Sequence, residues 1–303
     1  MDVDIAILFL ISALFGIASK AFVKICSNIV PNNSAAKYSL VLVVNSIVGC
    51  AFFMISGGFA LAFTVETLVY SLVFALIVTG SIILGIVSHR YASIMGVNVL
   101  SSTLNVACTA VIGWVFLSEK LGASGILRVL VVCEAAVIEF INQYLKGKKK
   151  NGDKREGGIL PLILVIAAIS LIGCMCTVTL KLFSMSQNVT DENSFFFLTN
   201  AVLCVGAAVV FLIACLVKKD EFRGAISLLH PKRVVLLAGN TACGNITTLI
   251  SALIIARMDV AVYSPISFAV GILAGLVGSL IFKERLGILS YVAAVVACLA
   301  MVI

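Results

Sequence analysis

Amide and hydroxyl side chains that could line a solute path recur along two apolar segments of this sequence. Residues 94–117 carry the first set, which is Asn98, Ser101, Ser102, Asn105 and Thr109; residues 234–256 carry the second set, which is Thr241, Asn245 and Thr248. Spacings of three, four and seven residues place each set on one face of a helix. Polar groups facing lipid are costly, so we expect both faces to meet protein or a water-filled cavity. Hydrogen bonding between helices is the competing interpretation for any single residue, whereas the run of five favours a cavity lining.

Glu134 is an ionisable carboxylate in the middle of another apolar segment, residues 123–144. A carboxylate at that depth costs several kcal/mol unless it is paired or hydrated, and it commonly serves ion coupling. The hypothesis is that Glu134 faces the interior and binds a proton in one state and releases it in the other. The alternative is that Glu139, further along the same segment, marks a hydrated segment end.

A further apolar segment, residues 260–282, combines candidate solute contacts with residues that affect the helix backbone. Tyr263 and Ser267 are candidates for the cavity lining, and Pro265 between them removes a helix hydrogen bond and favours a kink. Gly271 and Gly275 form a Gly-x-x-x-Gly spacing, which lets a neighbouring backbone approach closely. A hinge and tight packing without solute contact are both open interpretations.

The composition of the chain indicates the kind of protein that carries these side chains. The chain has 303 residues, of which 62% are hydrophobic and 12% are charged, and its mean hydropathy is +1.20. Soluble domains carry about 25% charged residues, so this surface fits a bilayer. The apolar runs are continuous and do not alternate, which predicts an all-α integral membrane protein with ten transmembrane helices. The predicted spans are 4–26, 38–58, 67–88, 94–117, 123–144, 159–183, 194–217, 234–256, 260–282 and 286–303.

The chain also repeats itself. A shift of 165 residues brings Glu119 onto Glu284 and Gly122 onto Gly287, in the turns FLSEKLG and IFKERLG. The predicted organisation is a first five-helix repeat (1–144), a basic linker (145–158) and a second five-helix repeat (159–303). Because five is odd, the second copy must enter the bilayer from the opposite side, as in inverted-repeat transporters.

The repeat also suggests roles for individual residues. Asn45 and Asn200 fall at comparable places in the two copies and are expected to face each other across the pseudo-axis. The two glutamates of the turns precede a helix start, where a carboxylate interacts favourably with the helix dipole, so their role is structural. Lys20, Lys24 and Lys181, near predicted span ends, are expected to extend to the headgroups.

Ten spans, two five-span halves and a Glu–basic–Leu–Gly turn closing spans four and nine resemble the drug/metabolite transporter superfamily, EamA-like branch. The resemblance covers essentially the whole chain. It implies a monomer or homodimer in the plasma membrane that carries a small organic metabolite or cation by alternating access, with export favoured. The family commonly has proline in both span four and span nine; here Pro265 provides the second, while the aligned position in span four is Leu100.

The orientation is left open by two disagreeing arguments. With the amino terminus outside, cytoplasmic ends would hold 17 of the 21 basic residues, which the positive-inside rule favours. The family resemblance implies cytoplasmic termini instead. The basic residues collect at segment ends, so the net charge of +7 does not predict a nucleic-acid partner.

The predicted function is secondary transport, with protons as candidate coupling ion and membrane lipids and a small-molecule substrate as partners. An enzyme is not expected, because both histidines lie at segment ends or in loops and no nucleophile–base pair emerges. No cofactor, metal site or phosphate-binding loop is predicted either. The expected cargo is polar neutral, zwitterionic or cationic, because clustered basic residues for a multivalent anion are missing. A lipid or headgroup flippase, or a non-transporting membrane subunit, is the alternative.

Overall fold

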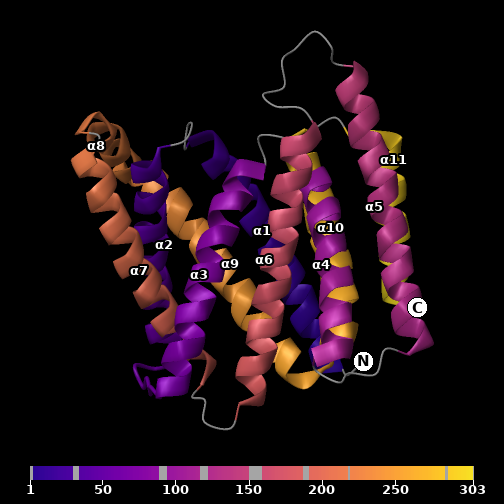
Figure 1. Cartoon of the computed structure of the whole chain (residues 1–303), viewed down its shortest axis with the longest axis horizontal. Helices are drawn as coiled ribbons and strands as arrows, with labels where there is room; N and C mark the ends of the chain where they lie inside the picture. The colour runs from indigo at the N-terminus through magenta and orange to yellow at the C-terminus, as the bar shows by residue number, and fades with distance from the viewer. Residues whose placement is uncertain are drawn as a thin grey trace.

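The computed structural model describes residues 3–29, 34–88, 94–116, 122–149, 159–186, 191–217, 219–283 and 286–302. Over this part of the chain all regular secondary structure is helical, and short turns and loops connect the helices (Figure 1). The helices are α1 (Val3–Ile29), α2 (Ala35–Ser56), α3 (Val65–Ser88), α4 (Ile94–Phe116), α5 (Ala123–Lys149), α6 (Ile159–Met185), α7 (Glu192–Val217), α8 (Lys219–Ile226), the 3-10 turn η1 (Ser227–Leu229), α9 (Pro231–Arg257), α10 (Val260–Ile281) and α11 (Ile288–Val302).

Eight of these helices are long and apolar enough to cross a membrane: α1, α2, α3, α4, α6, α7, α9 and α10. The chain is therefore an α-helical, multi-pass membrane protein. The two remaining predicted spans form helices, α5 and α11, that are not among these eight long apolar helices. Helix α5 carries Arg128, Glu134 and Glu139 along its length, and α11 has only 15 residues. The segment after α7, which lies between two predicted spans, contains α8 and η1.

Polar side chains near the helix ends fix where several helices start and stop. Ser34 precedes α2, and its hydroxyl accepts a hydrogen bond from the Lys37 amide at 3.3 Å. The Asp191 carboxylate accepts one from the Ser194 amide at 2.8 Å in the first turn of α7. At the other end of a helix, the Lys181 ammonium donates to the carbonyls of Ile255 and Met258, at 3.2 and 3.1 Å, where α9 ends. Lys181 thus serves a helix terminus rather than extending to the headgroups as predicted.

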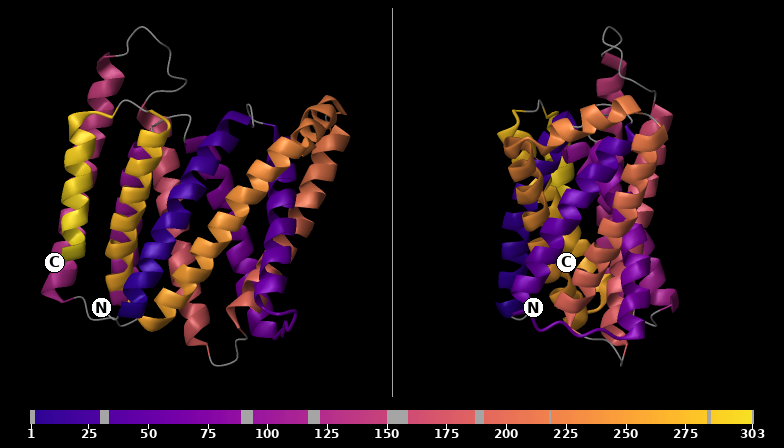
Figure 2. Two further views of the ribbon diagram at one scale, coloured as in Figure 1. Left: turned by 180° about the vertical axis from the view of Figure 1, so that it is seen from behind. Right: turned by 90° about the vertical axis from the view of Figure 1, so that its left-hand side faces the viewer.

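The helices pack in a set of recurring pairs (Figures 1 and 2). Helices α2 and α7 pack together at one end of the molecule, and α5 and α11 pack together at the other, with α4 against α10 next to them. Helices α1, α3, α6 and α9 fill the middle, where α1 packs against α9 and α3 against α6. Helix α9 runs obliquely across the molecule in Figure 2. The α5–α11 pair therefore lies at the edge, away from the middle helices.

Aromatic side chains form the densest part of the core. The cluster draws on α2, α3, α6 and α7 through Phe53, Phe74, Phe183, Phe195 and Phe196. The rings of Phe183 and Phe195 stack with centroids 4.2 Å apart, and those of Phe53 and Phe196 stack at 5.0 Å. This cluster lies where α2 and α6 approach their carboxyl ends and α7 begins.

Candidate functional site

A cavity of about 460 Å³ lies in the middle of the molecule. All eight long apolar helices contribute to its wall, whereas α5 and α11 contribute nothing to it among the described residues. Its polar lining is Ser19, Lys20, Asn45, Ser46, Ser81, Ser88, Ser101, Cys176, Thr177, Thr199, Asn200, Asn240, Thr241, Asn245, Thr247, Thr248, Ser251 and Tyr263. Phe53, Phe74 and Phe196 bring the aromatic cluster into the same wall. A volume of a few hundred Å³ is typical of small-molecule sites.

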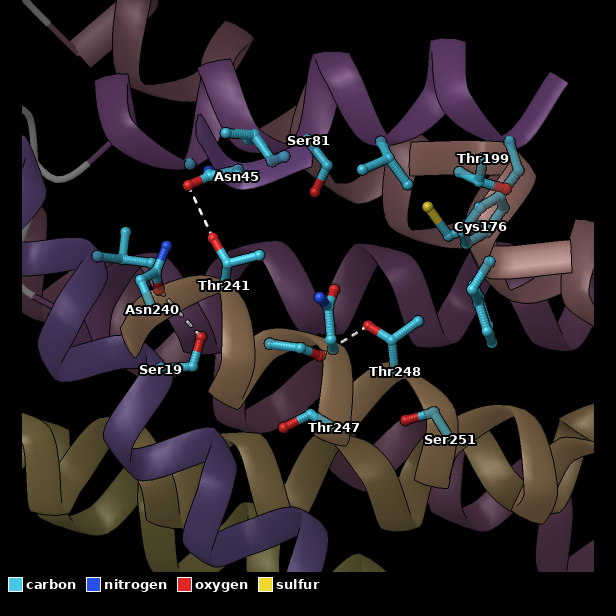
Figure 3. A pocket seen from close by; sticks show the side chains of 18 of the residues that line it. Ser19, Asn45, Ser81, Cys176, Thr199, Asn240, Thr241, Thr247, Thr248 and Ser251 are labelled. Atoms are coloured by element: carbon cyan, nitrogen blue, oxygen red, sulfur yellow. Dashed lines mark hydrogen bonds between the residues drawn. The ribbon is translucent and has the colours of Figure 1, made fainter. Parts of the chain in front are cut away.

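Helix α9 provides the most continuous polar wall (Figure 3). Its polar lining residues run from Asn240 to Ser251, which is about 16 Å at the helical rise. Two hydrogen bonds tie this wall to other helices. The Thr241 hydroxyl lies 2.7 Å from the Asn45 amide oxygen on α2, and the Ser19 hydroxyl on α1 lies 3.4 Å from the Asn240 amide oxygen.

The hydroxyls of the lining mostly donate to the backbone of their own helices. Thr247 donates to the Cys243 carbonyl and Thr248 to the Gly244 carbonyl, both at 2.9 Å. The hydroxyls of five further lining residues donate in the same way to the carbonyl four positions back, namely those of Ser46, Ser101, Thr177, Thr199 and Thr241. A hydroxyl has a single proton, so these oxygens present lone pairs to the cavity and act as acceptors.

The charge of the cavity comes from one side chain. Lys20 on α1 is half-buried and is the only charged residue among the described lining residues. Asn245 on α9 also lines the cavity, and its amide nitrogen is buried without a hydrogen-bond partner within the described chain. The site therefore combines one ammonium, amide donors and a larger number of hydroxyl acceptors.

A smaller pocket of about 190 Å³ lies beside the main cavity. Its lining is Ser102, Asn105, Val106, Thr177, Tyr263, Ser264, Ser267 and Phe268, from α4, α6 and α10. Thr177 and Tyr263 line both spaces and form the partition between them. The hydroxyl of Ser267 lies 3.4 Å from that of Tyr263.

The structure brings most of the predicted lining residues together, but it divides them between two spaces. The main cavity receives Asn45, Ser101, Asn200, Thr241, Asn245 and Thr248. The smaller pocket receives Ser102, Asn105 and Ser267, and Tyr263 reaches both. Thr109, the last member of the stripe on α4, is buried and donates to the Asn105 amide oxygen at 2.9 Å. The side chain of Asn98 lies outside the described residues.

Asn45 and Asn200 both line the cavity from the packed α2–α7 pair, yet they do not pair with each other. Asn200 donates to the Phe196 carbonyl at 2.8 Å, and Asn45 is engaged with Thr241. The Asn200 amide occupies the space where a side-chain carbon on Gly49 of α2 would lie. Gly49 is thus the residue that lets α7 bring Asn200 against α2.

The expected interior position of Glu134 is wrong. Glu134 is exposed on α5, and α5 does not reach the cavity in the described structure. The reason is that α5 packs with α11, α4 and α10 at the edge of the molecule, so its outward face carries Glu134. Its neighbour Glu139 is fully buried instead of marking a wet end, and it accepts from the Asn142 amide at 3.2 Å.

The proline and the two glycines predicted to shape α10 differ in their surroundings. Pro265 lies inside α10 and is buried, as is Gly275. Gly271 does not mediate the close approach expected of it, because a side-chain carbon there would meet no atom within 4 Å. The neighbouring helix is not in contact at that point, so the Gly-x-x-x-Gly interpretation fails at Gly271.

The duplicated turns lie at the starts of the two edge helices. The Gly122 carbonyl accepts from the Ile126 amide at 3.1 Å, and the Gly287 carbonyl accepts from the Ser290 amide at 2.9 Å. Each glycine therefore stands at the entry to α5 or α11. Glu119 and Glu284 lie outside the described residues.

Several lining residues were not predicted from the sequence, above all Lys20. The others include Ser19, Ser81, Ser88, Cys176, Thr199, Asn240 and Thr247. Ser81 and Ser88 on α3 are seven residues apart, which is a helical-face spacing and a usable signal. Lys20 gave no such signal, because a lysine near a predicted span end is equally compatible with a headgroup contact.

Comparison with known proteins identifies the fold but no family. No family model matches the chain, and no curated protein matches it. A solved structure described only as "Crystal structure of protein" is similar at 13% sequence identity with a TM-score of 0.59, and the alignment covers 96% of each chain. At that identity the likeness concerns the fold alone: the whole chain has the helical architecture of a protein already seen in a crystal.

Proposed function

We propose that the protein is a secondary transporter that moves a small polar organic solute across a membrane by alternating access. The observation that carries this proposal is the central cavity, since all eight long apolar helices line it with polar side chains. Polar groups at membrane depth are expensive, and a multi-pass protein that gathers them around one cavity uses them for a solute path. The aromatic cluster of α2, α3, α6 and α7 would be the closed side of that path in this conformation.

The proposal includes ten membrane crossings in two inverted five-helix repeats. The packing supports it. When the helices of the first half (α1, α2, α3, α4 and α5) are exchanged in order for those of the second half (α6, α7, α9, α10 and α11), each major helix pair corresponds to another observed pair or to itself. The α1–α9 pair becomes α6–α3, α1–α10 becomes α6–α4 and α2–α9 becomes α7–α3, while α2–α7, α4–α10 and α5–α11 map onto themselves. Such an exchange is what inverted-repeat transporters use to switch access from one side to the other.

The resemblance to EamA-like drug/metabolite transporters agrees with this arrangement. By that resemblance, the protein is proposed to reside in the plasma membrane and to favour export. Proton coupling through Glu134 is not part of the proposal, because that side chain is exposed on an edge helix.

The test is solute exchange by the full-length protein in proteoliposomes loaded with a cell extract, followed by mass spectrometry of released metabolites. Thr248→Phe fills the cavity and is expected to abolish the exchange, because Thr248 lies in its wall. Val235→Phe is the matched control, since Val235 is 68% exposed on the same helix and should leave exchange intact. Release identical to that of protein-free liposomes would contradict transport, and movement of fluorescent lipid between leaflets would favour the flippase instead.

A further inference from the structure

Lys20 occupies a position that the described part of the chain does not explain. It lies in the apolar stretch Asp4–Ile25 of α1 and points its charge into the central cavity wall. An ammonium at membrane depth is stable only when it is paired or hydrated. No aspartate or glutamate is among the described lining residues, and Lys20 makes no hydrogen bond or ion pair within the described chain.

Lys181 shows what a structural lysine looks like in the same molecule. Its ammonium donates to two backbone carbonyls at the end of α9, at 3.1 and 3.2 Å. The fold thus provides acceptors for one intramembrane lysine and leaves the other facing an open polar space. That contrast indicates that the partner of Lys20 comes from outside the chain.

The surroundings of Lys20 favour an anionic acceptor group as that partner. The preceding residue, Ser19, donates its hydroxyl proton toward the Asn240 amide oxygen at 3.4 Å, which leaves the Asn240 amide nitrogen as a donor. The buried amide nitrogen of Asn245, one turn further along α9, is without a partner in the described structure. Lys20 is the charged member of this group, and a carboxylate is an anionic acceptor that forms strong hydrogen bonds with an ammonium.

We infer that Lys20 anchors a carboxylate of the transported solute, which makes small monocarboxylic organic acids the substrate class. This inference rests on the proposed function and departs from the polar neutral, zwitterionic or cationic cargo expected from the sequence. The hydroxyls of α9 that donate to their own helix, such as Thr247 and Thr248, would accept from hydroxyl or amine groups elsewhere on the acid. A multivalent anion is disfavoured, because only one basic residue is present among the described lining.

The experiment compares acids with their uncharged amides as ligands of the full-length protein in proteoliposomes. The probes are benzoate against benzamide and nicotinate against nicotinamide, used as competitors during reductive methylation of lysines. Mass spectrometry follows the labelling of Lys20, and Lys24, which does not line the cavity, is the internal reference. The acids are expected to slow labelling of Lys20 at concentrations at least about tenfold lower than the amides, and to leave Lys24 unaffected. Equal protection by acid and amide, or protection by neither, overturns the inference.

Variants keep the test independent of the labelling chemistry. Thermal unfolding should show that benzoate and nicotinate stabilise the wild type and Lys20→Arg, whereas Lys20→Gln loses the preference for acids over amides. Lys24→Gln, which removes the same charge from the same helix, should retain it. Exchange of carboxylic acids that Lys20→Gln leaves unchanged would overturn this inference while transport stands. Selective protection of Lys20 by acids without exchange of any solute would overturn transport while the carboxylate site stands.

Discussion

Thr241 on α9 and Asn45 on α2 meet across the cavity, with 2.7 Å between the threonine hydroxyl and the amide oxygen (Figure 3). The two residues are 196 positions apart in the chain. By the proposed repeat, α2 belongs to the first five-helix unit and α9 to the second. The bond therefore joins two elements that alternating access would move relative to each other.

Removing this bond should weaken the present conformation by a modest amount. Thr241→Val and Asn45→Leu, combined in a double-mutant cycle, are expected to give a coupling of about 0.6 kcal/mol, as is typical between membrane helices. The cycle is needed because Thr241 also contacts the Leu237 carbonyl at 3.0 Å. The measurement is the free energy of unfolding in mixed detergent micelles, and a coupling of zero would contradict a contribution from the bond.

Gly49→Ala should disturb the α2–α7 pair, because the Asn200 amide occupies the space of the added methyl group. Overpacking of this kind costs about 1–3 kcal/mol. The substitution should also break the bond from Asn200 to the Phe196 carbonyl and shift that side chain in the cavity wall. Gly206→Ala on α7 is the control, since a methyl group there meets no atom within 4 Å. Equal unfolding midpoints for the two variants would show that Asn200 moves aside without cost.

Lys181→Met should loosen the end of α9, because two backbone carbonyls lose their charged donor. Hydrogen bonds to charged groups contribute about 1.5–3 kcal/mol each when buried, and the half-buried site lowers the expected loss to about 1–2 kcal/mol in total. Hydrogen exchange of residues around Ile255 and Met258 should accelerate. Lys232→Met at the exposed start of α9 removes a charge without removing a cap. Unchanged exchange in Lys181→Met would contradict the capping role.

Glu134→Gln should leave transport unaffected, including transport driven by a pH gradient, because the side chain is exposed on an edge helix and does not line the cavity. The measurement is initial exchange rate in proteoliposomes with and without the gradient, with Thr248→Phe as the inactive reference. A selective loss of gradient-driven transport would restore the coupling role that the sequence suggested.

The sequence was sufficient for the helices but not for their rotation about their own axes. The predicted span 94–117 became Ile94–Phe116, because a continuous apolar run with charges only at its ends can cross a bilayer in just one way. Which face of α1 turns inward is decided by its packing against α9 and α10, and a helix that is apolar on all sides carries little trace of that choice. Lys20 was therefore assigned to the headgroups although it lines the cavity.

Glu134 illustrates the opposite error. Its position in the middle of a predicted span suggested an interior carboxylate, but depth along a helix says nothing about whether that helix is central. Helix α5 lies at the edge with α11, a relationship between residues far apart in the chain that no local pattern encodes. The predicted stripe of α9 lines one cavity, because period and polarity together define a direction on a helix, whereas the predicted stripe of α4 is divided between two spaces.

Thr177 and Tyr263 belong to the walls of both polar spaces. The Tyr263 ring is buried and packs against Phe9 of α1, with centroids 6.1 Å apart. Any movement of α1 against α10 would therefore shift a side chain that shapes both compartments. A change in the volume of one space is thus coupled to a change in the other.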